Sequence, residues 1–171
     1  MISQLKNNIL ITGYKVDKSI KFKEVINIEK FIMFSNKIFR NTQSYLDKVL
    51  KKYDLSSGAY PYLFILEKNE GISQNKISKE IGNDKAMSTR TINKLIEGNY
   101  VYREQDEKDS RAYKLYLTPK AKEIIPKIRE EIQIVVNLIT EDLSEEEMNL
   151  TMKSLKKIFE RTQVLKKMEE L

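Results

Sequence analysis

The run DEKDSRAYKLYLT, residues 106–118, constrains the fold more than any other stretch, because a charged segment leads directly into strict alternation. Tyr113, Leu115 and Leu117 occupy every second position, which is typical of a β-strand with one buried face. The segment Tyr100–Glu104 is a second β-prone run, and the residues between the two runs have the polarity of a hairpin tip. The sequence therefore predicts a β-hairpin with a charged tip.

Two short helices are predicted immediately before this hairpin. Ser73 has the features of an N-cap with a hydrophobic staple across it, and Gly82 is placed to end the short helix that follows. A second helix begins at Asn83 or Asp84 and ends by Gly98. Two short helices joined by a tight turn and followed by a hairpin form a winged helix-turn-helix.

Longer amphipathic helices are predicted on both sides of this unit. Apolar residues recur at steps of three and four between about residues 28 and 52, and a shorter helix starts near Pro61. Thr118 is the N-cap of a helix after the hairpin, and Ser144 begins a capping box for the last helix. The outer helices have broad apolar faces and no sequence left within the chain to bury them, so we expect a second copy of the chain to do so.

The predicted fold class is mainly α with a small β-wing, in which long terminal helices for dimerisation flank a winged helix-turn-helix core. The expected divisions are 1–27, an N-terminal extension of unknown structure; 28–56, an N-terminal dimerisation helix; 57–118, the winged DNA-binding domain; and 119–171, the C-terminal dimerisation helices. The extension has weak strand character, and an added hairpin, an extra dimer contact and a basic arm for DNA phosphates all stay open for it.

Composition excludes several kinds of function. The chain has no cysteine and no histidine, which removes disulfides, thiolate or imidazole metal sites, and the commonest general base. The five glycines form no phosphate-binding loop, and the common catalytic triads need residues that are absent. We therefore expect neither an enzyme nor a bound cofactor. No apolar run approaches the length of a membrane span and no signal peptide is recognisable, so a cytoplasmic location is expected.

The net charge of +6 is spread along the chain rather than concentrated. Residues 73–111 carry eight basic and seven acidic side chains, and residues 112–171 carry eleven of each. DNA-binding proteins usually show a basic stripe. Bulk charge therefore supports DNA binding only weakly, and the prediction depends on the pattern of residues.

The second short helix has an outward face suited to the DNA major groove. With Ile92, Leu95 and Ile96 directed inward, a period of 3.6 residues leaves Ser88 partly inward and turns a polar set outward. Arg90 and Asn93 are the first candidates for base contacts, since arginine recognises guanine and asparagine recognises adenine. The other candidates on this face are Lys85, Met87, Thr89 and Lys94. The alternative is an ordinary solvated polar face.

The hairpin tip and the start of the first short helix are candidates for further DNA contacts. Arg111 can enter the minor groove, where narrow A·T tracts concentrate negative potential, while Lys108 and Ser110 can touch phosphates. Ser73 and Gln74 would present helix N-terminal N–H groups to a phosphate. The alternative for the tip is a surface hairpin of mixed charge.

These residues resemble the winged-helix core of the MarR family of bacterial transcription regulators. The resemblance is carried by GISQNKISKEIGNDKAMSTRTINKLIEGNYVYREQDEKDSRAYKLYLTPKAKEI, and most specifically by Asp109-x-Arg111 followed by Leu117-Thr118. It extends over roughly residues 28–165 and implies that Asp109 orients the wing arginine. The family usually has glycine where Asn99 stands, with the glycine of this chain one place earlier, which leaves the end of that helix to be determined.

The resemblance also implies a homodimer that binds a roughly palindromic operator, usually as a repressor. It implies that a small anionic, often aromatic, molecule tunes DNA binding from a crevice between the dimer helices and the winged module. Candidates to line this crevice are Ser35, Arg40, Tyr60, Tyr62 and Phe64. Aromatic side chains at helical spacing also occur as ordinary core, which is the alternative for these residues. Sensing through cysteine oxidation, or zinc sensing through cysteine or histidine, is closed to this chain.

One rival to DNA binding remains from the residues themselves. A winged-helix dimer could act as a protein-interaction module without specific contacts to DNA. Its best support is the weak positive charge of residues 73–111, together with Asp106, Glu107 and Asp109 in the wing.

Overall fold

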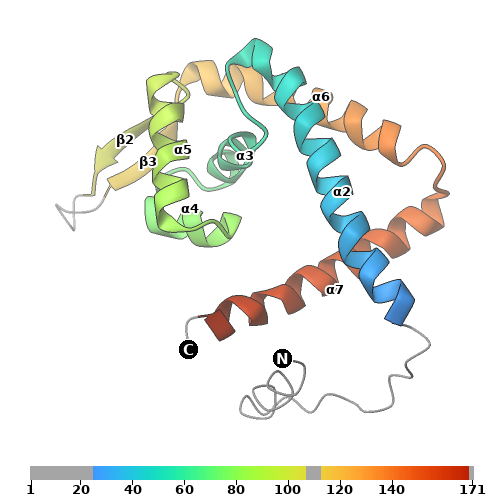
Figure 1. Cartoon of the computed structure of the whole chain (residues 1–171). Coiled ribbons are helices and arrows are strands. Elements are labelled where there is room, and N and C mark those ends of the chain that lie inside the picture. Colours follow the sequence, from blue (N-terminus) through green and yellow to red (C-terminus); the bar gives the residue numbers. More distant parts are fainter. Residues whose placement is uncertain (1–24, 107–112, 170–171) are drawn as a thin grey trace. The chain divides into compact units, whose positions relative to one another are not determined.

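The computed structural model of the protein describes residues 25–106 and 113–169 and is mainly helical (Figure 1). Its helices are α2 (Val25–Leu50), the 3-10 helix η2 (Lys51–Tyr53), α3 (Tyr60–Lys68), α4 (Gln74–Ile81), α5 (Lys85–Glu97), α6 (Pro119–Ile139) and α7 (Glu145–Glu169). Its strands are β1 (Ile72–Ser73), β2 (Val101–Gln105) and β3 (Tyr113–Leu117). The predicted fold class, helical with a small β-wing, is confirmed. None of the helices in the described ranges has the length and apolarity to cross a membrane.

The chain divides into two units, Met1–Thr42 and Gln43–Leu171, and the division falls within α2. In the first unit, the part of α2 that follows Ile28 exposes several large apolar side chains, among them Phe31, Phe34 and Phe39. The predicted extension, residues 1–27, lies almost wholly outside the described residues. The predicted amphipathic helix at about 28–52 is confirmed, and it begins at Val25 and ends at Leu50.

The hydrophobic core of the second unit surrounds α3. Tyr62 and Leu63 of α3 have no exposed surface. The side chains that complete the core come from the end of α2, from α4 and α5, from the sheet, and from α6: Leu50, Ile77, Ile92, Leu95, Val101, Leu115, Ile125 and Ile128. The first half of α6 therefore belongs to the same core as the helix-turn-helix, and this core extends beyond the predicted boundary at residue 118.

The wing is a three-stranded antiparallel sheet in the order β1-β3-β2. The hairpin of β2 and β3 was predicted, but β1 was not, because a strand of two residues is too short to show a period. Ile72 pairs with Leu115 and Ser73 with Lys114, which attaches the start of α4 directly to the wing.

The expectation that Tyr113 belongs to the buried face of its strand is wrong. Leu115 and Leu117 are buried, whereas Tyr113 is 44% exposed. Tyr113 pairs with Gln105 at the outer end of the hairpin, beyond the reach of the core, and the guanidinium of Arg103 lies 5.1 Å from the centre of its ring.

The predicted helix caps are present. Asp84 Oδ1 accepts a hydrogen bond of 2.7 Å from Met87 N–H, and Thr118 Oγ1 accepts one of 3.2 Å from Ala121 N–H. Gly82 has φ of 82°, the left-handed conformation expected at the end of α4. At Ser144 the capping box is reciprocal, since the Glu147 carboxylate accepts from Ser144 N–H and Ser144 Oγ accepts from Glu147 N–H.

The end of α5 is a Schellman motif centred on Asn99. Tyr100 N–H donates to Leu95 O at 2.8 Å and Asn99 N–H donates to Ile96 O at 2.9 Å, the two bonds that define the motif. Asn99 has φ of 58°, whereas Gly98 has the ordinary helical φ of −75°. A Cβ on Gly98 would lie 3.1 Å from the Tyr100 ring, so Gly98 provides room for this ring while Asn99 supplies the left-handed backbone.

We expect substitutions of Asn99 to test the role of its left-handed backbone. Asn99→Ala should lower the free energy of unfolding by about 1 kcal/mol, because a left-handed backbone is costly for alanine. Asn99→Gly should be neutral or stabilising, because glycine adopts positive φ without penalty. Urea unfolding of the two variants measures the difference. Equal stabilities for the alanine and glycine variants would contradict this explanation.

Candidate nucleic-acid interface

The N-terminus of α4 is fixed against the first half of α5 by a side-chain hydrogen bond. Gln74 Nε2 donates to Thr89 Oγ1 at 2.7 Å, and Thr89 Oγ1 in turn donates to Lys85 O at 2.8 Å. Both Gln74 and Thr89 are among the predicted DNA-binding residues, and their bond to each other was not predicted. The start of α4 therefore lies beside the outward face of α5.

The outward face of α5 has the composition that its helical period predicted. Arg90 and Asn93 are exposed, and Met87 is 46% exposed. Lys85 and Lys94 are exposed as well, Thr89 is half-buried, and the opposite face of the helix packs into the core. The residues of this face therefore share one accessible surface that a duplex could contact.

A buried network of polar side chains fixes α5 from its inner side. The Tyr62 hydroxyl donates to Ser88 Oγ at 3.0 Å, and Asn83 Nδ2 donates to the Tyr62 hydroxyl at 3.2 Å. Ser88 and Tyr62 have no exposed surface. The network joins α3, the turn between α4 and α5, and α5 itself, so that it holds the three segments in one arrangement.

This network corrects the expectation for Tyr62. The sequence placed Tyr62 among the residues lining a ligand crevice, but its ring belongs to the core and its hydroxyl is engaged within the winged module. Its neighbours on α3 differ, since Tyr60 and Phe64 are half-buried and their rings meet edge to face with centres 5.4 Å apart. Burial raises the pKa of the Tyr60 hydroxyl.

The other two candidates for the ligand crevice lie on α2 in the first unit. Ser35 and Arg40 are both exposed, and Ser35 Oγ donates to Phe31 O at 2.8 Å. On the α3 side, the guanidinium of Arg129 lies 5.1 Å from the centre of the Phe64 ring. This pair, together with Tyr60, offers an aromatic surface with a cation beside it.

The ion pairs of the second unit lie outside the helix-turn-helix. Among the described residues, the ion pairs are Lys52–Glu131, Lys122–Glu70, Lys127–Glu123, Arg129–Glu67 and Lys114–Asp106. None of these pairs involves α4 or α5, which carry Lys76, Lys79, Lys85, Arg90 and Lys94. The even distribution of charge along the sequence therefore conceals a group of basic side chains without acidic partners in the described part of the chain.

Four predicted site residues lie outside the described residues, namely Lys108, Asp109, Ser110 and Arg111. Two further basic residues of the wing were missed by the sequence reasoning. Arg103 is exposed on β2, and Lys114 on β3 pairs with Asp106 at 3.5 Å. The alternation of the two strands could have identified them, had the register of the hairpin been known. Within the described ranges, no group of three or more metal-ligating side chains occurs.

Comparison with known proteins establishes the family. Residues 55–113 match the MarR family. The HTH-type transcriptional regulator BilQ of Clostridioides difficile is 36% identical over 116 residues, which are 68% of this chain and 78% of BilQ. The chain belongs to the MarR family. It is therefore a DNA-binding transcriptional regulator and not an enzyme, as the sequence predicted.

Solved MarR-family structures share the fold described above. A MarR transcriptional regulator from Methanosarcina mazei Go1 is 29% identical with a TM-score of 0.74, and the match covers 80% of this chain and 99% of that one. A mutant MarR from E. coli complexed with operator DNA is 21% identical with a TM-score of 0.69, over 82% of this chain and 99% of that one. At that identity the second likeness concerns the fold alone.

The buried network yields a prediction about stability. Tyr62→Phe should lower the free energy of unfolding by about 1–2 kcal/mol, because the Ser88 hydroxyl and the Asn83 amide lose a buried partner. Ser88→Ala should also destabilise, and the double variant should lose less than the sum of the single variants, as expected for residues in direct contact. Urea unfolding gives the three values.

Tyr60→Phe is the matched control. The Tyr60 hydroxyl makes no hydrogen bond with any described residue, so this variant should unfold at nearly the same urea concentration as the wild type. Strict additivity of Tyr62→Phe and Ser88→Ala would show that the bond between them contributes nothing.

Proposed function

We propose that this MarR-family protein is a homodimer that binds a roughly palindromic operator, represses transcription there, and is released by a small anionic or aromatic ligand. The observation that carries the proposal is the face of α5, where Arg90 and Asn93 are exposed on a helix fixed from behind by the buried Tyr62–Ser88 bond. A protein with this role acts on the chromosome, so we also propose a cytoplasmic location.

Base recognition is assigned to α5. The guanidinium of Arg90 can donate to guanine O6 and N7, and the Asn93 amide can bond to adenine N6 and N7. Met87 and the methyl group of Thr89 can contact a thymine methyl, while Lys85 and Lys94 flank the base-contacting residues. Because none of the cations on this helix is paired within the described chain, binding DNA breaks no ion pair there.

We assign contacts that position the protein on the duplex to the start of α4 and to the wing tip. Ser73 and Gln74 bring backbone N–H groups of α4 to a phosphate. At the wing tip, Arg111 enters the minor groove with Asp109 orienting it, while Lys108 and Ser110 contact phosphates. A solved structure of an E. coli MarR mutant complexed with operator DNA has the same fold and supports DNA binding in general.

The exposed apolar surface of the terminal helices supports the homodimer. Such large groups of apolar side chains are rare on monomers and mark interaction surfaces. The groups lie on α2, on the end of α6 and on α7: Phe31, Ile32, Phe34, Ile38 and Phe39; Ile134, Leu138 and Ile139; Leu150, Met152, Leu155 and Phe159. We propose that the exposed apolar faces within residues 28–56 and 119–171 form the dimer interface and hold two winged modules, residues 57–118, about one DNA turn apart.

The first test measures sequence-specific binding. The wild type should prefer its own upstream DNA over a scrambled duplex of equal length, and keep the preference as salt rises. Arg90→Ala and Asn93→Ala should each reduce the preference by about 1–3 kcal/mol, the value of one bidentate base contact. Fluorescence anisotropy titration measures both affinities.

A control separates base recognition from general loss of charge. Arg129→Ala removes an arginine of α6 that is paired with Glu67, and it should leave the preference between the two duplexes unchanged. Equal and salt-labile binding of wild type to every duplex, including those selected from a random pool, would favour the alternative function, an interaction module that does not recognise DNA sequence.

The second test addresses the ligand. We propose that Tyr60 and Phe64 line the ligand site, since half-buried aromatic rings with the Arg129 guanidinium beside Phe64 suit an aromatic acid. Ser35 and Arg40 stay candidates on the family resemblance alone. A phenolic acid should weaken operator binding by population shift, and Tyr60→Ala should reduce this effect without changing affinity for DNA in the absence of the acid. Titration of the acid against a preformed complex measures release. If no phenolic or other aromatic acid alters DNA affinity, the proposed release mechanism is wrong.

A further inference from the structure

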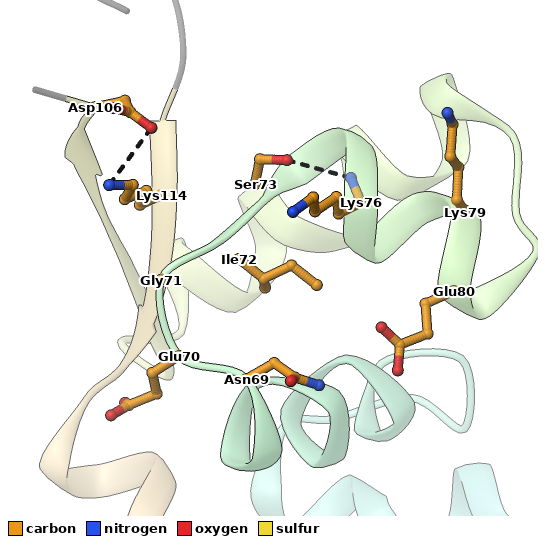
Figure 2. Close-up of a pocket in the computed structure, with 10 residues that line it drawn as sticks. All are labelled: Asn69, Glu70, Gly71, Ile72, Ser73, Lys76, Lys79, Glu80, Asp106 and Lys114. Atoms are coloured by element: carbon orange, nitrogen blue, oxygen red, sulfur yellow. Dashed lines mark hydrogen bonds and ion pairs between the residues drawn. The ribbon is translucent and has the colours of Figure 1, made fainter. Parts of the chain in front are cut away.

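We propose that the pocket between α4 and the wing binds one phosphate of the DNA backbone through Lys76 and Lys114. Figure 2 shows this pocket, which has a volume of about 840 Å³ and is lined by the segment Asn69–Ser73, by α4, and by Asp106 and Lys114. The inference rests on the proposed DNA binding and adds a binding site for one backbone phosphate. Of the residues that line this pocket, only Ser73 has been proposed above to contact DNA.

The two lysines come from different elements, α4 and β3, and the short strand β1 connects these elements. Ser73 is the N-cap of α4 and also the register partner of Lys114, because β1 pairs with β3. Lys76 lies three residues further along, where its N–H donates to Ser73 Oγ. In Figure 2 the Lys76 side chain extends from α4 toward the side of the pocket formed by the wing. The pairing of β1 with β3 therefore places Lys114 beside the N-cap of α4, and both lysines line the pocket.

The charges around the pocket favour an anion at this end. Lys76 makes no hydrogen bond through its ammonium group and no ion pair with any described residue. Lys114 has 37% of its side chain exposed and is 3.5 Å from Asp106, a distance at which the pair is weak and a phosphate can compete.

Of the remaining acids in the lining, Glu70 is already engaged. Its carboxylate accepts from Leu117 N–H at 3.0 Å and from Lys122 Nζ at 3.1 Å, and these contacts hold its pKa below the ordinary value. In Figure 2 its carboxylate points away from Lys76 and Lys114. Glu80 lies on the last turn of α4, at the opposite end of that helix from Ser73. The acids therefore leave the Ser73 end of the pocket positive.

The position of the pocket in the fold matches that of a backbone strand. A single sugar–phosphate strand separates a major groove from the adjacent minor groove. The elements for the two grooves are α5 and the wing tip, and the start of α4 is attached to both: to α5 through the Gln74–Thr89 bond, and to the wing through β1. When α5 and the wing tip occupy adjacent grooves, the strand between them passes the start of α4, where the positive end of that helix adds to the two lysines.

The experiment measures how binding depends on salt. Lys76→Gln and Lys114→Gln should each weaken binding to the upstream DNA and to a scrambled duplex by the same factor, because a phosphate contact is independent of sequence. The slope of log affinity against log salt concentration should fall by about 0.9 for each lost contact, hence by about twice that for a dimer.

Two further variants make the test sharper. Lys127→Gln removes the same charge from α6, where Lys127 is paired with Glu123, and should leave the slope unchanged. Asp106→Asn should have the opposite effect to Lys114→Gln and strengthen binding to both duplexes, because Lys114 loses its acidic partner and a negative charge near the phosphate is removed. Circular dichroism of each variant verifies that it is folded.

The outcomes distinguish this inference from the proposed function. An unchanged slope in both lysine variants overturns the phosphate site, even if the wild type prefers its operator. A wild type without sequence preference overturns the proposed function, whereas the slope test on any duplex still decides the phosphate site. Inorganic phosphate is added last, at constant ionic strength. Saturable competition with DNA that disappears in Lys76→Gln supports the site, whereas saturable phosphate binding that leaves DNA affinity unchanged would assign the pocket to a free anion and overturn the backbone contact.

Discussion

The hydrogen bond from Tyr62 to Ser88 connects the hydrophobic core to the helix whose outer face is proposed to contact DNA. Tyr62 is central to the core, and Ser88 is on the inner side of the helix whose outer side carries Arg90 and Asn93. A core of aliphatic side chains alone allows a helix to rotate or slide by small amounts, because dispersion contacts are not directional. A buried hydroxyl pair, joined by the Asn83 amide, is directional and costly to separate. The orientation of α5 therefore depends on a polar contact made within the core.

Electrostatics is organised by the pairing of charges rather than by their number. Carboxylates lie close to Lys52 of η2 and to Lys122, Lys127 and Arg129 of α6, whereas the cations of α4 and α5 have no such partners among the described residues. Ion pairs at a surface contribute little to stability, but each one lowers the potential that a distant phosphate experiences. The unpaired cations of the helix-turn-helix therefore produce a positive electrostatic potential that can attract a polyanion. This potential does not require an excess of basic residues in the sequence.

Local features of the fold could be predicted from the sequence, and long-range features could not. The caps at Asp84 and Thr118 and the hairpin after Tyr100 follow from side-chain chemistry within a few residues, and each prediction is confirmed. The pairing of Ile72 with Leu115 joins residues 43 positions apart and involves only two residues of β1, so it leaves no periodic signal.

The same distinction applies to the candidate site. The outward set on α5 follows from the helical period, and it is confirmed as an exposed face. The interior position of Tyr62 could not be predicted, because three tyrosine or phenylalanine residues on α3 occupy similar sequence contexts, and only the packing of α5 distinguishes them. Lys76 and Lys114 were likewise separate residues until the sheet register brought them to one pocket. The wing tip lies outside the described residues, so its assignment stays a prediction.

One half of α6 lies in the hydrophobic core and the other half is exposed, and this arrangement has a mechanical consequence. Its first half, with Ile125 and Ile128, is embedded in the core, and its second half exposes Leu138 and Ile139. A continuous helix of 21 residues is about 30 Å long, and one that is clamped at one end works as a lever arm. The free second half is about 15 Å long, so a tilt of about 6° displaces its end by about 1.5 Å. Small changes of packing around α3 would therefore cause larger displacements at the free end of α6.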